Sequence, residues 1–171
     1  MKRSNILNAE LNCAIASMGH TDLMIVCDAG FPIPDDAWRI DLAVVPDVPD
    51  LETVLTAIAG DFIAERVSYA AEMAENNAPL LAKVQRIFAD SNFDPIPHAQ
   101  ILGEMAAQAK VIVRTGAFDP WGNILLYRGV DAPVWFAKPG LKVPDVYRQR
   151  VEQMRRGGIE QQRKRRTGGQ A

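Results

Sequence analysis

Histidine and carboxylate side chains flank one short apolar run of this 171-residue chain. Its two histidines are His20 and His98, and imidazole is the side chain best suited to exchanging protons near neutral pH. Asp28 directly follows the apolar run 23–27, so it is predicted at the carboxyl end of a strand, where α/β sheets bind ligands. His20 precedes the same run. We therefore expect His20 and Asp28 at one sheet edge, where they can transfer protons.

Each of these residues also has a purely structural interpretation. A histidine that follows a helix is often a C-terminal cap, an aspartate before Ala-Gly often forms a turn, and the ring of His98 could cap the helix that it begins. A further alternative is an iron site of two histidines and one carboxylate, formed by His20, Asp22 and His98. The helix-rich pattern argues against that site, because sites of this type generally lie on β-rich barrels. We expect no metal.

Several familiar signatures are absent from the sequence, namely GxGxxG, GxxxxGK[ST], HExxH and GxSxG. Dinucleotide oxidoreductases, P-loop enzymes and serine hydrolases are therefore not leading hypotheses. Cys13 and Cys27 form no CxxC or zinc-type cluster, so both are predicted to be buried free thiols. Residues 1–5 are followed by a helix pattern that polar residues interrupt, and not by the apolar run of a signal peptide. This predicts a cytoplasmic protein with no membrane partner.

Apolar strands alternate with amphipathic helices along the chain. Helices are expected at 7–18, 49–58, 77–88 and 98–108, strands at 23–27, 40–45, 111–113 and 124–127, a strand entering a helix at 62–73, and an extended piece at 93–97. This alternation predicts an α/β fold, a layered domain with a largely parallel central sheet flanked by helices.

Several short blocks of sequence resemble one known family. They are Gly-His-Thr-Asp at 19–22, Cys-Asp-Ala-Gly-Phe-Pro-Ile-Pro at 27–34, Arg-Ile-Asp-Leu-Ala at 39–43, Pro-His at 97–98, Val-Ile-Val-Arg-Thr-Gly at 111–116 and Trp-Gly-Asn-Ile-Leu-Leu at 121–126. Together they resemble the D-ribose pyranase and L-fucose mutarotase family over about residues 5–130. The loop after Asp28 and the histidine at position 98 are closer to the ribose branch.

The resemblance implies an isomerase without cofactor or metal, which interconverts the pyranose and furanose forms, or the anomers, of a free monosaccharide. A base takes the anomeric hydroxyl proton while an acid protonates the ring oxygen, and the ring then closes again. By the family pattern His20 transfers the protons, Asp28 binds sugar hydroxyls, and His98 and Asn123 form hydrogen bonds with the sugar. Family members form ring-like homo-oligomers, commonly decamers, in which one subunit's C-terminal turn completes its neighbour's site.

Two positions depart from the family pattern. Trp121 stands where tyrosine is usual, which keeps a stacking surface at the expected sugar site but replaces a hydroxyl by an N–H donor. The lysine usual about one helical turn after His98 is missing, since Ile101, Leu102 and Gly103 stand there. The identity of the sugar is therefore open. The alternative function is a sugar-binding accessory or regulatory protein with little turnover.

The charge of the chain divides near the end of the resemblance. Residues 1–137 hold nine basic and 18 acidic residues, a net charge of −9, whereas residues 138–171 carry +7. We predict a catalytic domain at 1–130 and a basic C-terminal extension at 131–171, partly helical (143–156) or disordered. A solvated tail is favoured over a nucleic-acid contact at 163–166. A third possibility is that Val134, Trp135 and Phe136 attach the segment to the acidic domain.

Overall fold

A six-stranded sheet forms the centre of the molecule in the computed structural model, which describes residues 5–156. Its strand order is β2-β5-β1-β6-β3-β4, with bounds β1 Leu23–Cys27, β2 Arg39–Asp41, β3 Ala64–Ala70, β4 Asn92–Ile96, β5 Val111–Arg114 and β6 Ile124–Arg128. Pairing is parallel between β1 and β5, β2 and β5, and β3 and β4, whereas β6 runs antiparallel to β1 and β3. Five strands thus share one direction, and the predicted largely parallel sheet is confirmed.

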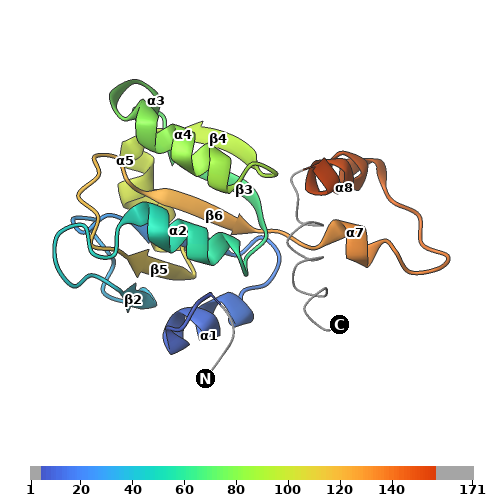
Figure 1. The fold of residues 1–171 in the computed structure, drawn as a ribbon, viewed down its shortest axis with the longest axis horizontal. Helices are drawn as coiled ribbons and strands as arrows, with labels where there is room; N and C mark the ends of the chain where they lie inside the picture. The colour runs from blue at the N-terminus through green and yellow to red at the C-terminus, as the bar shows by residue number, and fades with distance from the viewer. Residues whose placement is uncertain (1–4, 157–171) are drawn as a thin grey trace.

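Helices cover the sheet (Figure 1). Their bounds are α1 Ala9–Ser17, α2 Leu51–Ala59, α3 Met73–Asn76, α4 Ala78–Ile87, α5 His98–Gln100, the π-helical η1 Ile101–Met105, α6 Ala106–Gln108, α7 Ala132–Trp135 and α8 Asp145–Arg156. Short polar side chains begin four of them, because Asn8, Asp50, Asn77 and Asp131 each accept a backbone N–H of the first turn.

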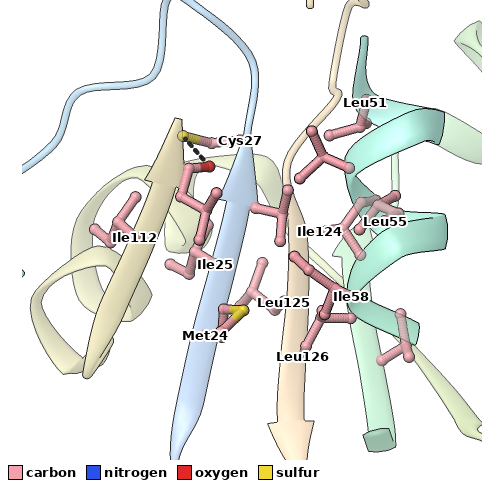
Figure 2. Packing of buried hydrophobic residues seen from close by; sticks show 14 of the residues in the cluster. Met24, Ile25, Cys27, Leu51, Leu55, Ile58, Ile112, Ile124, Leu125 and Leu126 are labelled. Carbon is pink, nitrogen blue, oxygen red and sulfur yellow. Dashed lines mark hydrogen bonds between the residues drawn. The ribbon is translucent and has the colours of Figure 1, made fainter. Parts of the chain in front are cut away.

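The core is a continuous cluster between these helices and the sheet. All five residues of β1 are buried, as expected for a central strand covered on both faces. Figure 2 shows Leu51, Leu55 and Ile58 of α2 directed toward β6. All three are fully buried, and burial of such a side chain contributes about 1.5–3 kcal/mol to stability.

The reversed strand β6 determines which loops meet at each end of the sheet. We call the end at which β1, β3, β4 and β5 finish the carboxyl edge, and the opposite end the amino edge. Because β6 is antiparallel to its neighbours, it begins at the carboxyl edge, where Ile124 pairs with Val26 and Tyr69. The turn before β6 and the loop after β1 are therefore brought together.

The segment after β6 folds at the amino edge. Figure 1 shows α7 and α8 beside the end of the sheet at which β6 finishes. A second hydrophobic cluster forms there from the following residues: Val130, Ala132, Val151 and Met154, with Ile63, Phe136, Val143 and Tyr147 packed against them. The rings of Phe136 and Tyr147 lie 5.2 Å apart. Phe136 thus packs within this cluster, whereas the Trp135 side chain is exposed. Attachment of the segment to the acidic domain through residues 134–136 stays a prediction.

Three local expectations are corrected. The second strand ends at Asp41 and does not continue to 45, because the chain leaves the sheet and exposes Val44 and Val45. The helix predicted at 98–108 has a π-helical centre. Cys13 is exposed, since α1 turns its other side to the core, whereas Cys27 is buried as predicted.

Within residues 5–156, no helix is both long and apolar enough to cross a membrane. The basic run at 163–166, with its proposed nucleic-acid contact, lies outside the described residues.

Candidate active site

Three of the predicted site residues meet at the carboxyl edge. The Oδ1 atom of Asn123 accepts the backbone N–H of Asp28 at 3.3 Å, and its Nδ2 atom lies 3.4 Å from Nε2 of His98. The Asn123 side chain is buried, while Asp28 and His98 are partly exposed. Within residues 5–156, the carboxylate of Asp28 accepts the N–H of the nearby Gly30. This cluster thus brings together a carboxylate, an imidazole and a buried amide from three different segments.

Asn123 is positioned by a tight turn before β6. Its backbone N–H binds the carbonyl of Trp121, whose φ of 58° is uncommon for a bulky residue. At Gly122 an added Cβ would lie 2.8 Å from the carbonyl oxygen of Asp119, so only glycine fits the turn. The Trp121 side chain packs against the main core as a partly buried residue. Trp121 therefore supports the turn that delivers Asn123.

A cavity of about 330 Å³ adjoins this cluster at Asp28. Its lining residues are Asp28, Gly30, Ala117, Phe118, Asp119 and Pro120. Its volume lies within the usual range of small-molecule pockets. Burial raises the pKa of the Asp119 carboxyl, and the negative charge of Asp47 raises it further. The cavity thus has two carboxyl groups, Asp28 and Asp119.

His98 is fixed through its backbone as well as its ring. Both carboxylate oxygens of Glu72 lie within hydrogen-bonding distance, 3.1 and 3.2 Å, of the His98 backbone N–H. The ring points toward Asn123 and does not cap the helix, so the capping interpretation is wrong. The π-helix η1 begins three residues later, and such irregular turns are frequent at functional sites. Ile101 is buried in it, so no cationic side chain follows His98 there.

His20 lies at the amino edge, away from this cluster. It precedes β1, while Asp28 follows it, and the five residues of β1 separate the two edges by roughly 16 Å. The expectation that His20 and Asp28 share one sheet edge is therefore wrong within a single chain. The reason is elementary, since an extended strand carries its flanking residues to opposite ends of the sheet.

His20 has a carboxylate partner that sequence reasoning missed. Its Nε2 atom lies 3.0 Å from Oε2 of Glu65 at the start of β3, and about one third of each side chain is exposed. The next residue, Thr21, has a φ of 71°, an unusual conformation for a β-branched residue, and its N–H binds the Arg128 carbonyl. Strained backbone of this kind tends to persist at functional sites.

The other charged pair beside His20 joins Asp22 to Lys110. Lys110 also donates to the carbonyl of Ser17, and the Gly19 N–H donates to Asp22. The hydrogen bond from Lys110 is the main cause that lowers the pKa of Asp22. This pair fixes the turn that carries His20.

Metal ligation is not supported by this geometry. The described residues contain no group of three or more His, Cys, Asp or Glu side chains that could bind a metal ion. In particular, His20 and Asp22 lie at the amino edge and His98 lies at the carboxyl edge, so these residues do not converge within one chain.

Comparison with known proteins identifies the family of this chain. The model of the RbsD / FucU transport protein family matches residues 1–131. The chain belongs to this family. Its match covers both sheet edges and stops just before α7, so α7 and α8 lie beyond the part shared across the family.

Curated relatives and a solved structure extend the match. The chain is 57% identical over 151 residues to D-ribose pyranase 2 of Rubrobacter xylanophilus, covering 88% of this chain and 98% of that protein. It is 53% identical over 151 residues to D-ribose pyranase 1 of Streptomyces griseus, covering 88% and 100%. The structure of Bacillus subtilis RbsD complexed with D-ribose superposes with a TM-score of 0.72 and 32% identity, covering 76% of this chain and 98% of that one.

Proposed function

We propose that this protein is an isomerase that interconverts the pyranose and furanose forms, or the anomers, of a free ribose-like monosaccharide. The observation that carries the proposal is the cluster of Asp28, His98 and Asn123 beside a cavity, in a chain of a family whose named members include D-ribose pyranases. The reaction needs groups that bind hydroxyls and one group that moves a proton. It requires no cofactor, because opening breaks the ring C–O bond while the anomeric C–OH becomes a carbonyl, closure reverses both changes, and only protons are transferred.

The residues at the carboxyl edge have the donors and acceptors for a sugar. Asp28 accepts hydrogen bonds from two hydroxyls, whereas the His98 ring and the Asn123 amide each pair with one. Trp121 supplies an apolar surface beside the turn. When the ring opens, a proton leaves the anomeric hydroxyl and another reaches the ring oxygen, and closure through a different hydroxyl gives the new ring size. General acid–base help of this kind accelerates a reaction by about 10² to 10⁴.

The proton-transfer role falls to His20, which requires a second copy of the chain. Since a distance of roughly 16 Å along β1 separates His20 from Asp28, both residues contact one sugar only when they come from different subunits. We propose that His20 of the partner subunit faces the cavity of the first. This arrangement supports the ring-like homodecamer implied by the resemblance, because one patch binding a different patch generates a ring.

Saturation-transfer NMR on free sugars tests the function. In equilibrated D-ribose the enzyme is expected to accelerate magnetisation exchange between pyranose and furanose signals, and His20→Ala is expected to abolish this exchange. L-Fucose and related sugars serve as comparisons that identify the substrate. The function is wrong if no sugar exchanges faster with the protein. Sugar binding in calorimetry without faster exchange would establish the alternative, an accessory sugar-binding protein.

Three further features belong to the proposal. The protein is cytoplasmic, it forms the homodecamer described above, and it acts on a free sugar without a nucleic-acid partner. The proposed boundary at 130, between the catalytic domain and the basic extension, is supported by the family match, which covers residues 1–131.

A further inference from the structure

The start of β3 has an irregularity that directs Glu65 out of the ladder. In the pairing with β6, Ala64 lies opposite Arg128 and Arg66 lies opposite Tyr127, so two steps along β3 correspond to one step along β6. Glu65 is the extra residue of this β-bulge. Bulges reorient a side chain and are frequent next to active sites. Here the reoriented side chain is the one that contacts His20.

Gly129, which directly follows β6, leaves room for Glu65. Gly129 donates its N–H to the Ile63 carbonyl, and a Cβ added to Gly129 would lie 2.7 Å from the Cβ of Glu65. Any larger residue at position 129 would therefore displace Glu65. The close approach of the two backbones is a requirement for the position of the carboxylate.

The C-terminal segment beyond the family match also contacts the start of β3. Arg150 of α8 is buried, and its Nη2 atom donates to the carbonyl of Ala64 at 3.1 Å, while Nη1 donates to the carbonyl of Asp90. Burial lowers the pKa of Arg150, whereas the negative charges of Asp90 and Glu65 raise it. The guanidinium is therefore bonded to the residue before Glu65 and interacts electrostatically with the Glu65 carboxylate.

We propose that Glu65 is the positioning residue of His20, and that segment 131–156 acts through Arg150 to fix Glu65. The carboxylate accepts the Nε2–H of His20, which sets one tautomer and leaves Nδ1 free to exchange protons with the sugar. α8 thereby adds a support that the family match, ending at residue 131, does not include. This inference rests on the proposed isomerase function for its kinetic consequences, but the contact itself is testable without activity.

Kinetics of four variants test the proposal. Glu65→Leu is expected to lower kcat about tenfold to a hundredfold, which is a part of the acceleration that general acid–base catalysis provides. KM is expected to stay unchanged, because Glu65 does not touch the sugar. Glu65→Gln keeps an acceptor oxygen and is expected to recover most of that loss. Arg150→Met is expected to lower kcat severalfold. Arg148→Met is the matched control, since Arg148 is an exposed residue of the same helix and forms an ion pair with the exposed Asp145.

A double variant separates positioning from general destabilisation. If Arg150 acts through Glu65, Arg150→Met causes no further loss of kcat in the Glu65→Leu background. An equal loss in both backgrounds, or an equal loss in Arg148→Met, overturns the role of Arg150. Retention of full kcat by Glu65→Leu overturns the whole proposal. Thermal unfolding of each variant verifies that the measurements are made on folded protein.

Imidazole ¹⁵N NMR provides a readout that needs no turnover. The chain has only two histidines, and His98→Gln identifies the signals of His20. In the wild type a single Nε2–H tautomer is expected for His20, and in Glu65→Leu a mixture of tautomers. An unchanged tautomer in Glu65→Leu overturns the inference. Absence of sugar exchange in the wild type would instead refute the proposed function and leave the NMR test of the contact valid.

Discussion

The Nδ2 atom of Asn123 lies 3.4 Å from the Nε2 atom of His98, although 25 residues separate them along the chain. Asn123 immediately precedes the reversed strand β6, and His98 follows β4 at the outer side of the sheet. The other end of the same amide binds the Asp28 backbone. One buried amide therefore sets the spacing of the two groups that we propose to bind the sugar.

Replacement of Asn123 by leucine tests this role. The variant removes the amide from both neighbours and keeps the branched shape of the side chain, so kcat/KM for ring exchange is expected to fall about fivefold to 150-fold, the effect of losing roughly 1–3 kcal/mol. The exposed Asn92→Leu at the amino edge is the control and is expected to retain full activity. Steady-state NMR exchange rates on both variants measure the difference. Equal activity in the two variants would contradict the assigned role.

Subunit mixing tests the proposed contribution of His20 from a partner. His20→Ala and Asp28→Asn are each expected to be inactive alone. When equal amounts are refolded together, about a quarter of the sites combine an intact pocket with an intact partner histidine, if each site uses two adjacent subunits. Exchange activity of about a quarter of the wild-type value is then expected. A mixture of Asp28→Asn and Asn123→Leu serves as the control and is expected to remain inactive, because every pocket is defective.

Prediction from sequence succeeded where the signal is local. The uninterrupted apolar run of β1 places Asp28 at the carboxyl edge, and the helical spacing of apolar residues at 7–18 and 49–58 identifies two helices. The meeting of Asn123 with Asp28 depends on where β6 inserts and on its direction, which are long-range properties. The placement of His20 was wrong because a position in the chain next to β1 was equated with a position next to Asp28.

Glu65 shows a different limit of sequence reasoning. Residues 62–73 carry both strand and helix signals, so no face of the segment could be assigned before the structure was known. A β-bulge has no strong sequence signature, and it alters which side of the strand a residue occupies. The contact between Glu65 and His20 therefore could not be predicted from the sequence.

The two cysteines are expected to differ in reactivity toward a thiol reagent. Burial, with a further contribution from the charge of Asp28, raises the pKa of the Cys27 thiol, and its Sγ atom donates to the Val113 carbonyl. Cys13 is exposed on α1. One thiol of the native protein is therefore expected to react with a disulfide reagent at pH 8, and two after unfolding. Cys13→Ser is expected to lose the native reaction, and a persistent fast thiol in that variant would contradict the burial of Cys27.

The Asp22 turn is expected to make stability depend on pH. The hydrogen bond from Lys110 lowers the pKa of Asp22 in the folded protein. The charged carboxylate therefore stabilises the fold at pH values above the pKa of the unfolded chain, about 3.9. This contribution is lost as the pH falls through the lower pKa of the folded chain. Asp22→Asn is expected to reduce the free energy of unfolding at pH 7 by about 1 kcal/mol, the upper end for exposed ion pairs.

Urea denaturation at pH 7, 5 and 3 measures this contribution. The difference between the wild type and Asp22→Asn is expected to be largest at pH 7 and to shrink at pH 3, because part of the contribution is lost once the pH is below the unfolded pKa of about 3.9. Asp145→Asn is the control, because its ion pair with Arg148 is almost fully exposed and is expected to contribute nothing measurable. A constant difference at all three pH values would assign the effect to the shape of the side chain and not to its charge.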